Sequence, residues 1–466
     1  MTRSRGVAAA ALAIGLLVTG LDEAEAQTSI REIVTLRHGE TLDDYQVLRQ
    51  IALTPDGARA ATVSYGLARV WNARTGKLLW ELSSKYKSDE DTLIAHPVFS
   101  PDGSLLALAV RGEVALYAAA DGTKLARLTG HDPVLWTWRT PIAFSPDGNW
   151  LLTTAIARRD SKGPDGAAWI FPVGDRSGPS WLYRKWRGLL GPEELPARHM
   201  LMPLERPKAQ GDPFPPEGWV QEIRFSRDSA EVLMLGSPAV FAYSVSDGRE
   251  VRRFGPTTPR DQYRVDAQQD PWVGASGVSW LTSISPSGRH VVECTDGTLW
   301  IRPAERNPRP EIELPLAIQL RGLNSLKHNC VFSPDGIRIA AWWPDQRRTP
   351  IVEVNVWDMT GKPSLRYFAP GREGRFEPAV ITALHWSGDG RRIVAVDSAK
   401  TLRVFDPERD ELLVRHQRPD QGKGDSLLAV DHTGTRFLTD RVGREGPARR
   451  ARWVEAQVWE VVVQER

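Results

Sequence analysis

The sequence predicts an all-β fold, a β-propeller of four-stranded blades, and three observations point to it. A five-residue turn pattern recurs along the chain. Each copy is followed by two short apolar strands, of which the second carries a large aromatic side chain. The composition, 41% hydrophobic and 25% charged, is that of a soluble protein. A chain of 466 residues with these proportions buries a large core and is neither disordered nor collagen-like.

The turn pattern reads Phe-Ser-Pro-Asp-Gly in its complete form. Complete copies begin at Phe99, Phe144 and Phe332. Weaker copies begin at Leu53, Phe225, Ile284, Trp386 and Val430, which makes eight. In such a segment Ser caps the turn with its hydroxyl, Pro presets φ, and Gly takes the left-handed conformation. The pattern therefore predicts a strand, a tight turn and a second strand in every unit.

The rest of each unit predicts two more strands. The third strand carries the large aromatic residue, and a second tight turn usually leads to a fourth strand, as at Asp121-Gly122-Thr123. The predicted third-strand aromatics are Trp71, Tyr117, Phe171, Tyr243, Trp300, Trp357, Phe405 and Trp459. A four-stranded unit cannot bury both of its faces alone, so we expect the units to stack around a ring.

Eight turns predict eight blades. The last unit ends without a fourth strand, and Ile30 to Leu36, ahead of the first unit, can supply it. Such pairing would close the ring and protect an open edge. Seven blades with a separate hairpin are the alternative, because the unit at Phe225 is degenerate.

Two short motifs add a family resemblance. Val356-Trp357-Asp358 matches a Trp-Asp signature, and Gly130-His131-Asp132 matches a Gly-His element. With the repeated turns, they make the chain resemble the WD40-repeat family in its bacterial Ser-Pro-Asp-Gly form, from about residue 30 to the end. The resemblance implies a β-propeller. Each motif occurs once, so most units depart from the full signature.

The first 26 residues predict an export signal. Arg3 and Arg5 precede an apolar stretch from Gly6 to Leu21, and Ala24-Glu25-Ala26 forms a cleavage site. The apolar stretch is shorter than the roughly 20 residues of a membrane span. We therefore expect residues 27–466 to form one periplasmic or secreted propeller, without a membrane span after signal cleavage. An uncleaved anchor is the alternative.

Charge and motifs limit the function. Lys and Arg number 60 and Asp and Glu 58, so the net charge of +2 argues against nucleic acid as a partner. The sequence has no Gly-x-Ser-x-Gly elbow and no His or Cys residues at zinc-site spacing, so we predict no catalytic residues, no metal and no cofactor. Cys294 and Cys330 fall in neighbouring predicted sheets, where a disulfide and two buried thiols both remain open.

The candidate binding residues lie in or beside long insertions and in the second-to-third strand loop of the sixth unit. Insertions are predicted at about residues 158–166, 187–218 and 256–277, mostly on the face that carries the second-to-third and fourth-to-first strand connections. Long loops on a rigid scaffold are the usual place for a binding surface. The residues predicted to bind are Trp186, Arg187, Tyr263, Trp272, Trp343, Arg347 and Arg348. The alternative is that these Trp residues pack between blades and the Arg residues are solvated.

These observations predict a monomeric, non-catalytic scaffold that binds a protein or a cell-envelope component. One enzyme class is the alternative. The segment Asn72 to Trp80 is similar to the tryptophan-docking motif of eight-bladed quinoprotein dehydrogenases, which implies a cofactor or metal in the central channel. Only the first unit carries this motif, and the adjacent-cysteine disulfide of that family is missing. A purely structural envelope protein is a further alternative.

Overall fold

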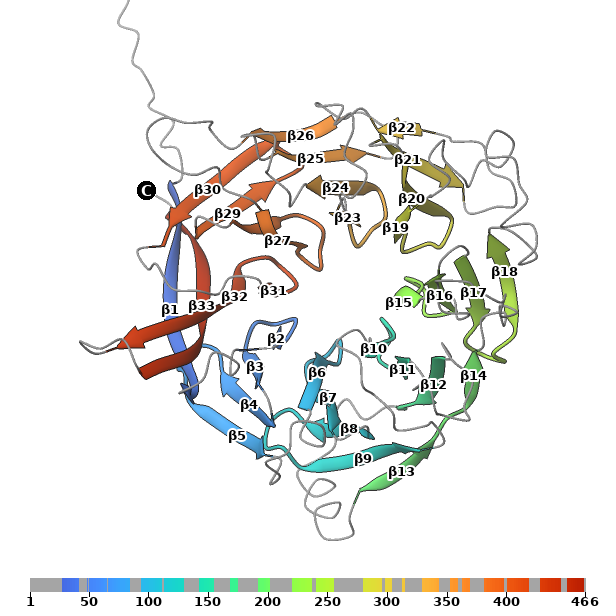
Figure 1. The fold of residues 1–466 in the computed structure, drawn as a ribbon, viewed down its shortest axis with the longest axis horizontal. Helices are drawn as coiled ribbons and strands as arrows, with labels where there is room; N and C mark the ends of the chain where they lie inside the picture. Colours follow the sequence, from blue (N-terminus) through green and yellow to red (C-terminus); the bar gives the residue numbers. More distant parts are fainter. Residues whose placement is uncertain are drawn as a thin grey trace, which may run out of the picture.

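The computed structural model is a ring of sheets around a central axis (Figure 1). It describes residues 27–41, 48, 50–64, 66–83, 94–110, 113–129, 142–154, 168–174, 192–201, 220–236, 240–254, 280–295, 298–303, 312–314, 329–342, 353–358, 363–368, 381–397, 400–418, 428–445 and 451–464. The strands in these segments form eight separate sheets, which we number in chain order. The predicted all-β propeller is confirmed.

Each sheet has strands A to D, from the axis outward. Sheet 1 contains β2 (Gln50–Leu53), β3 (Arg59–Ser64), β4 (Leu67–Asn72) and β5 (Leu78–Ser83). Sheet 2 contains β6 (Ile94–Phe99), β7 (Leu105–Val110), β8 (Glu113–Ala118) and β9 (Lys124–Thr129). Sheet 3 contains β10 (Ile142–Phe144), β11 (Trp150–Thr154), β12 (Ala168–Pro172) and β14 (His199–Leu201). Sheet 4 contains β15 (Val220–Phe225), β16 (Glu231–Gly236), β17 (Val240–Ser244) and β18 (Glu250–Phe254).

The second half of the chain repeats this arrangement. Sheet 5 contains β19 (Trp280–Ile284), β20 (His290–Thr295), β21 (Thr298–Pro303) and β22 (Ile312–Leu314). Sheet 6 contains β23 (Asn329–Phe332), β24 (Arg338–Trp342), β25 (Glu353–Asp358) and β26 (Pro363–Phe368). Sheet 7 contains β27 (Ile381–Trp386), β28 (Ile393–Asp397), β29 (Thr401–Asp406) and β30 (Glu411–Gln417). Sheet 8 contains β31 (Leu428–Val430), β32 (Arg436–Glu445), β33 (Ala451–Gln464) and β1 (Gln27–Thr41).

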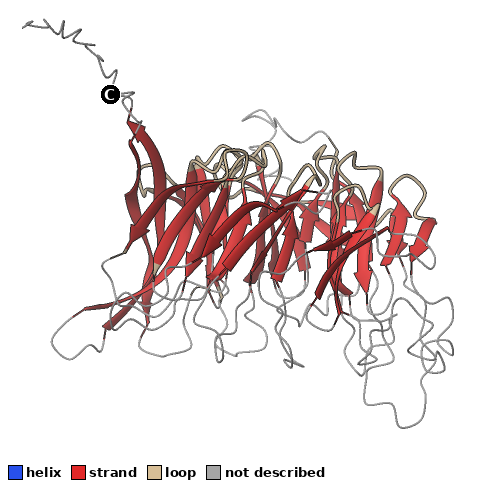
Figure 2. Ribbon diagram, turned by 90° about the horizontal axis from the view of Figure 1, so that it is seen from above, coloured by secondary structure: helices blue, strands red, loops and turns tan. Residues whose placement is uncertain are grey.

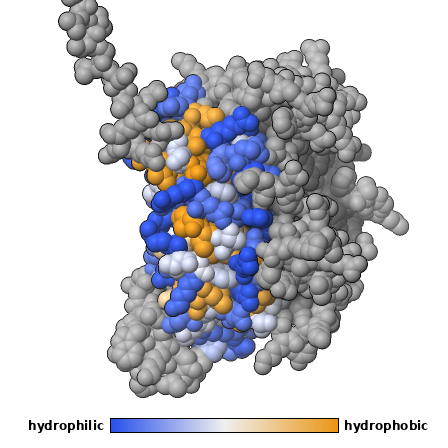
Figure 3. All heavy atoms as spheres, turned by 90° about the vertical axis from the view of Figure 1, so that its left-hand side faces the viewer, coloured by the Kyte–Doolittle hydropathy of each residue, from blue (hydrophilic) through white to orange (hydrophobic). Residues whose placement is uncertain are grey.

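Sheet 8 closes the ring with both ends of the described chain. β1 pairs antiparallel with β33, from Gln27 opposite Gln464 to Thr41 opposite Arg452. This confirms the predicted closure, although the pairing extends beyond Ile30–Leu36 at both ends. Apolar residues stand among hydrophilic ones on the outer side around β1 (Figure 3). Two register shifts and the exposed Arg31 and Arg37 make β1 a poor template for another strand.

The repeated turns satisfy their own polar groups. In the turn of sheet 2, the Ser100 hydroxyl donates to Asp102 Oδ1 over 2.5 Å and accepts from the backbone N–H of Leu105 over 3.0 Å. The same Asp oxygen accepts from the N–H of Ser104, and Gly103 has a φ of +69°. Equivalent bonds occur at Asp56, Asp147, Asp228, Asp335 and Asp389. These aspartates are turn residues, as their position in the pattern predicts.

All eight A–B turns lie on one face of the ring, which we call the turn face (tan loops in Figure 2). Because strand C runs back toward this face, the C–D connections open there too, and the B–C and D–A connections open on the opposite, loop face. Backbone bonds join some neighbouring turns, such as His432 N–H to Pro55 O over 2.8 Å between sheets 8 and 1. The ring is therefore closed at the turns as well as through β1.

The core fills the spaces between neighbouring sheets. Leu116 of sheet 2 packs in one cluster with Phe171 of sheet 3, and Val404 of sheet 7 in another with Phe437 of sheet 8. Because middle strands are covered on both faces, β28 is buried at every residue, whereas the outer β30 is not. Continuous apolar middle strands are the expected pattern for doubly covered sheets.

Outer strands contact the next sheet through a C–D turn glycine. A Cβ atom on Gly122 would lie 2.6 Å from Trp80, which comes from β5 of the preceding sheet. Val34 and His199 stand equally close to the equivalent Gly76 and Gly248. Trp80 also donates to Ala119 O over 3.1 Å. Trp80, the last residue of the segment that is similar to the tryptophan-docking motif, thus occupies a position that Val34 and His199 fill in other sheets.

One sequence prediction about the connections needs correction. Residues 187–218 are not one D–A insertion, because two short strands interrupt them. β13 (Glu193–Pro196) pairs parallel with β9 of sheet 2, and β14 then pairs with β12 as strand D of sheet 3. The Pro-rich composition hid these strands, although Pro196 is tolerated where it ends an edge strand.

All eight predicted strand C aromatics lie in strand C, and they differ only in register. We count each A–B turn from the Ser, Thr or Asp that directly follows strand A, such as Thr54 in sheet 1. Seven of the aromatics pair with the residue six positions after that start, as Trp71 does with Ala60. In sheet 5 that register position belongs to Arg302, opposite Val291, and Trp300 lies two residues earlier. Counting along the sequence found the aromatic residue but not its register.

Candidate functional site

All seven residues predicted to bind a partner lie outside the described residues: Trp186, Arg187, Tyr263, Trp272, Trp343, Arg347 and Arg348. Their connections can still be assigned. The segment with Tyr263 and Trp272 joins β18 to β19, and the segment with Trp343 joins β24 to β25, so both start from the loop face. Their binding role remains a prediction.

Trp186 and Arg187 belong to a different connection from the one predicted. They lie between β12 and β13, so their segment leaves strand C at the turn face. There the N–H groups of Val173 and Gly174 donate to Asn149 O in the A–B turn. The prediction that a D–A insertion begins at about Arg187, directly after Trp186, is therefore wrong, because strand D of sheet 3 begins only at His199.

The described residues place three buried polar networks directly beneath the loop face. The first joins sheets 8 and 1. His38 of β1 binds the Thr62 hydroxyl through Nδ1 over 2.7 Å and the Ser64 hydroxyl through Nε2 over 2.8 Å. The indole N–H of Trp71 donates to the same Thr62 oxygen over 2.8 Å. Arg69 donates to the backbone oxygen of His38.

Charge and hydrogen bonds define the state of His38. Burial, and secondarily the positive charge of Arg69, lower the pKa of His38 from 6.5 to about 3. The imidazole is therefore neutral near pH 7. Because Thr62 accepts from Trp71, we assign its hydroxyl proton to His38 Nδ1, and the Nε2 proton then goes to Ser64. With both ring nitrogens engaged, His38 links strands and is not a free general base.

The second network joins sheets 7 and 8. Arg418 directly follows β30, and its Nη1 donates to Thr439 Oγ1 over 3.0 Å and to Gln457 Oε1 over 2.9 Å. The indole N–H of Trp459 donates to Thr439 over 3.0 Å. The guanidinium also lies over the Trp459 ring, 5.9 Å from its centroid. Arg418 thus stands in the place that His38 takes beside sheet 1.

The third network lies within sheet 7, at the start of its B–C connection. Arg403 and Asp397 form an ion pair, and their side chains are 2% and 1% exposed. Asp397 Oδ1 also accepts from the N–H of Thr401 over 2.9 Å. Such a buried pair is costly to break, because the remaining charge would be left without a partner.

Sequence reasoning missed these networks, although a weak signal exists. Thr62 and Thr439 each stand eight residues after the first residue of their turn, and each faces a Trp in strand C. That spacing places each Thr in strand B two residues beyond the residue that pairs with the strand C Trp, on the side away from the turn. The third partners, His38 and Arg418, come from the preceding sheet and cannot be found by local spacing.

The remaining predicted site is the cysteine pair. Cys294 lies in β20 and Cys330 in β23, so they belong to neighbouring sheets, as predicted. A disulfide and two buried thiols stay the two predicted alternatives. Among the residues that the structure describes, no three His, Cys, Asp or Glu side chains are grouped as metal ligands would be. The same residues include no helix long and apolar enough to cross a membrane.

Comparisons with known proteins agree with this architecture. Residues 122–162 match the WD40 family, described as WD domain, G-beta repeat. The matched segment runs from the C–D turn of sheet 2 past strand B of sheet 3. The crystal structure of the C-terminal WD40 domain of Sif2 is similar over 93% of this chain and 98% of that one, with 14% identity and a TM-score of 0.55.

The comparisons identify the fold and no more. As many as 1345 solved chains match, so a likeness at this level selects no particular partner. No curated protein matches the sequence. The family match and the structural match together confirm the predicted resemblance to WD40-repeat propellers.

Proposed function

Because the chain is a WD40-type β-propeller, we propose that it is an exported, non-catalytic scaffold that binds a protein partner through its loop face. The observation that carries this proposal is the set of three buried networks beneath that face. His38, Arg418 and the Asp397–Arg403 pair fix the ends of the D–A and B–C connections in sheets 7, 8 and 1. Rigid loop bases reduce the entropy that a binding loop loses when it meets its partner.

The contrast between the two faces supports the same proposal. Every A–B turn is short, and most bond their own polar groups, whereas the connection from β18 to β19 spans residues 255–279 and that from β24 to β25 spans residues 343–352. The connection from β12 to β13, which starts at the turn face, is the exception. Added chain mostly on one face of a regular scaffold is typical of a binding surface. We further propose that the eight sheets act as eight blades of one closed, monomeric ring.

Export is the second part of the proposal. Gln27, the residue after the expected cleavage site, is the first residue of β1 and lies opposite Gln464. Cleavage there would leave the closing strand complete. N-terminal sequencing of the protein from its native host should begin at Gln27. A chain that begins at Met1 or Thr2 and stays in the cytoplasm would contradict the proposal.

Photo-crosslinking tests the binding surface. A photoreactive residue at Trp272 or Trp343 should capture one protein in the native host, identified by mass spectrometry. The control probe replaces Asp102, which is exposed on the turn face of sheet 2. Equal labelling from the control, or a lipid or glycan adduct in place of a protein, would overturn the proposed protein-binding loop face.

A further inference from the structure

The turn face carries four arginines at equivalent positions. Each is the sixth residue counted from the start of its A–B turn and stands at the beginning of strand B. They are Arg338, Arg392, Arg436 and Arg59, from the consecutive sheets 6, 7, 8 and 1. In sheets 2 to 5 the same position holds Leu105, Trp150, Glu231 and His290. The four arginines therefore form an arc over one side of the ring, which we call the basic arc.

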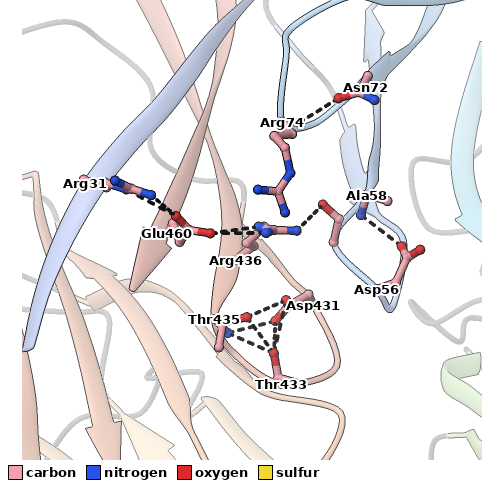
Figure 4. A network of polar contacts seen from close by, with 11 residues as sticks. Arg31, Asp56, Ala58, Asn72, Arg74, Asp431, Thr433, Thr435, Arg436 and Glu460 are labelled. Atoms are coloured by element: carbon pink, nitrogen blue, oxygen red, sulfur yellow. Dashed lines mark hydrogen bonds and ion pairs between the residues drawn. The ribbon is translucent and has the colours of Figure 1, made fainter. Parts of the chain in front are cut away.

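Three of these side chains reach toward the following sheet. Arg436 pairs with Glu460 over 3.2 Å and turns its Nη1 toward Gly57 O, 3.5 Å away in the turn of sheet 1 (Figure 4). A Cβ on Gly57 would lie 3.1 Å from Arg436 Cδ, and one on Gly434 would lie 3.2 Å from Arg392 Cδ. Arg338 reaches Glu408 of sheet 7 over 3.4 Å. The stems are thus fixed between neighbouring sheets.

Two of the arginines have an unused donor. Arg338 Nη1 and Arg392 Nη1 are buried, and no residue in the described segments accepts a hydrogen bond from either. Their counterpart in sheet 8, Arg436 Nη1, has the Gly57 oxygen. A buried donor without an acceptor is rare in native proteins and costs free energy. Because both atoms are buried, an incoming acceptor reaches them only when the two side chains turn outward, and the bond gained then offsets the cost of that movement.

The charge of the turns differs between the two sides of the face. In the six-residue turns of sheets 5 to 8 and 1, six arginines face four aspartates, which gives 6 − 4 = +2. In sheets 2 to 4, one arginine faces four acidic residues, which gives 1 − 4 = −3. The aspartates are engaged in their own turns. An anionic ligand would consequently be attracted to the basic arc and repelled from the other side.

We propose that the basic arc binds an extended acidic polypeptide segment of a partner protein. A guanidinium presents its N–H groups in a planar fork that matches a carboxylate. The arginines recur once per sheet, so the ligand must present several anionic groups along its length, which a single small anion cannot do. Side-chain carboxylates on an extended segment would reach Arg338 and Arg392 together. This surface lies opposite the loop face, so it does not depend on the proposed function.

Poly-L-glutamate, titrated into the full-length mature protein by calorimetry at low salt, tests the proposal. The wild type should bind it, and the double variant Arg338→Gln with Arg392→Gln should bind about tenfold more weakly, as expected for about 1.4 kcal/mol. The matched control is Arg227→Gln with Arg249→Gln, an equal charge change on the exposed turns of sheet 4. That control should leave the affinity unchanged.

Three results would overturn the proposal: no binding by the wild type, equal weakening by the control, or preference for inorganic polyphosphate over poly-L-glutamate. If the glutamine pair does not fold, Arg338→Lys with Arg392→Lys replaces it, because lysine keeps the stem and the charge but loses the fork. The lysine pair should bind poly-L-glutamate more weakly than the wild type. Equal affinity would refute a role for the two Nη1 donors.

Discussion

Sheets 1 and 8 use the same pair of residues with a different third partner. In both, a strand C tryptophan donates to a strand B threonine, Trp71 to Thr62 and Trp459 to Thr439. The third group is the neutral His38 in sheet 1 and the cationic Arg418 in sheet 8. The Trp–Thr hydrogen bond is therefore common to both sheets. The third polar group comes from the preceding sheet and differs between them.

The difference lies in how each third group is accommodated. Neutral His38 needs only the two hydroxyls of Thr62 and Ser64. Buried Arg418 carries a charge, and it gains a second acceptor in Gln457 and the face of an indole ring. We therefore expect the loss of Arg418 to cost more stability than the loss of His38, and only the His38 network to respond to pH through its third group.

Replacing Arg418 should have the largest effect. The variant Arg418→Ala leaves Gln457 Oε1 without this donor, removes one of the two donors to Thr439 Oγ1, and empties a buried volume. We expect the free energy of unfolding to fall by about 3 kcal/mol, measured by urea denaturation. The control Arg415→Ala changes an exposed residue of the same strand and should stay within about 0.5 kcal/mol of the wild type. Equal losses for both variants would refute the network.

The shared Trp–Thr bond should come next. Thr62→Val keeps the side-chain shape but removes the acceptor of Trp71 and the partner of His38, so we expect a loss of about 2 kcal/mol. Trp71→Phe removes the indole N–H together with part of the buried ring volume, and a cycle separates the pairwise term from this packing loss. A double-mutant cycle between the two should give a coupling of about 1 kcal/mol. Additive losses would mean that the two groups do not interact.

Sheet 1 should also give the protein a pH dependence. The pKa of His38 is lowered to about 3 in the folded state. As the pH falls below 6.5, His38 of the unfolded chain therefore binds a proton, while His38 of the folded protein stays neutral. Stability contributed by neutral His38 is complete above pH 6.5 and is lost between 6.5 and 3. The predicted slope is about 1.4 kcal/mol per pH unit.

Denaturation of the wild type and of His38→Gln at pH 7.5 and 5.5 isolates this effect. The wild type should lose about 1.4 kcal/mol more than the variant between the two pH values. Other histidines titrate equally in both proteins, so only the difference matters. If the wild type and His38→Gln lose the same free energy of unfolding between the two pH values, His38 is already accessible to protons in the folded protein.

The comparison also shows what a sequence can reveal. The turns were predictable because their chemistry is local: Ser100, Asp102 and Leu105 satisfy one another within five residues. The networks were not, because His38 and Thr62 lie in different sheets and Arg418 reaches Gln457 over 39 residues. Pairing across sheets depends on ring geometry, which no turn motif encodes.

β13 and the binding residues illustrate the same limit. β13 was missed because its four residues pair parallel with β9, a strand 67 residues earlier, and carry no alternating pattern of their own. Leu195 nevertheless packs in the core between sheets 2 and 3. The predicted residues Trp272 and Trp343 fall in connections whose ends are fixed by the sheets, while loop composition alone says little about their contacts.

Sheet 6 provides the smallest and most specific test of the shared bond. Trp357 takes the register position of Trp71, but Ala341 stands where Thr62 does, and no acceptor for the Trp357 indole N–H exists within the described part of the chain. Ala341→Thr should supply one and raise the free energy of unfolding by about 1 kcal/mol.

Ala341→Val adds similar volume without a hydroxyl and should give no such gain. If valine stabilises as much as threonine, packing and not the hydrogen bond explains the gain. A gain confined to threonine would show that the Trp–Thr bond stabilises a sheet without the third group that His38 and Arg418 provide elsewhere.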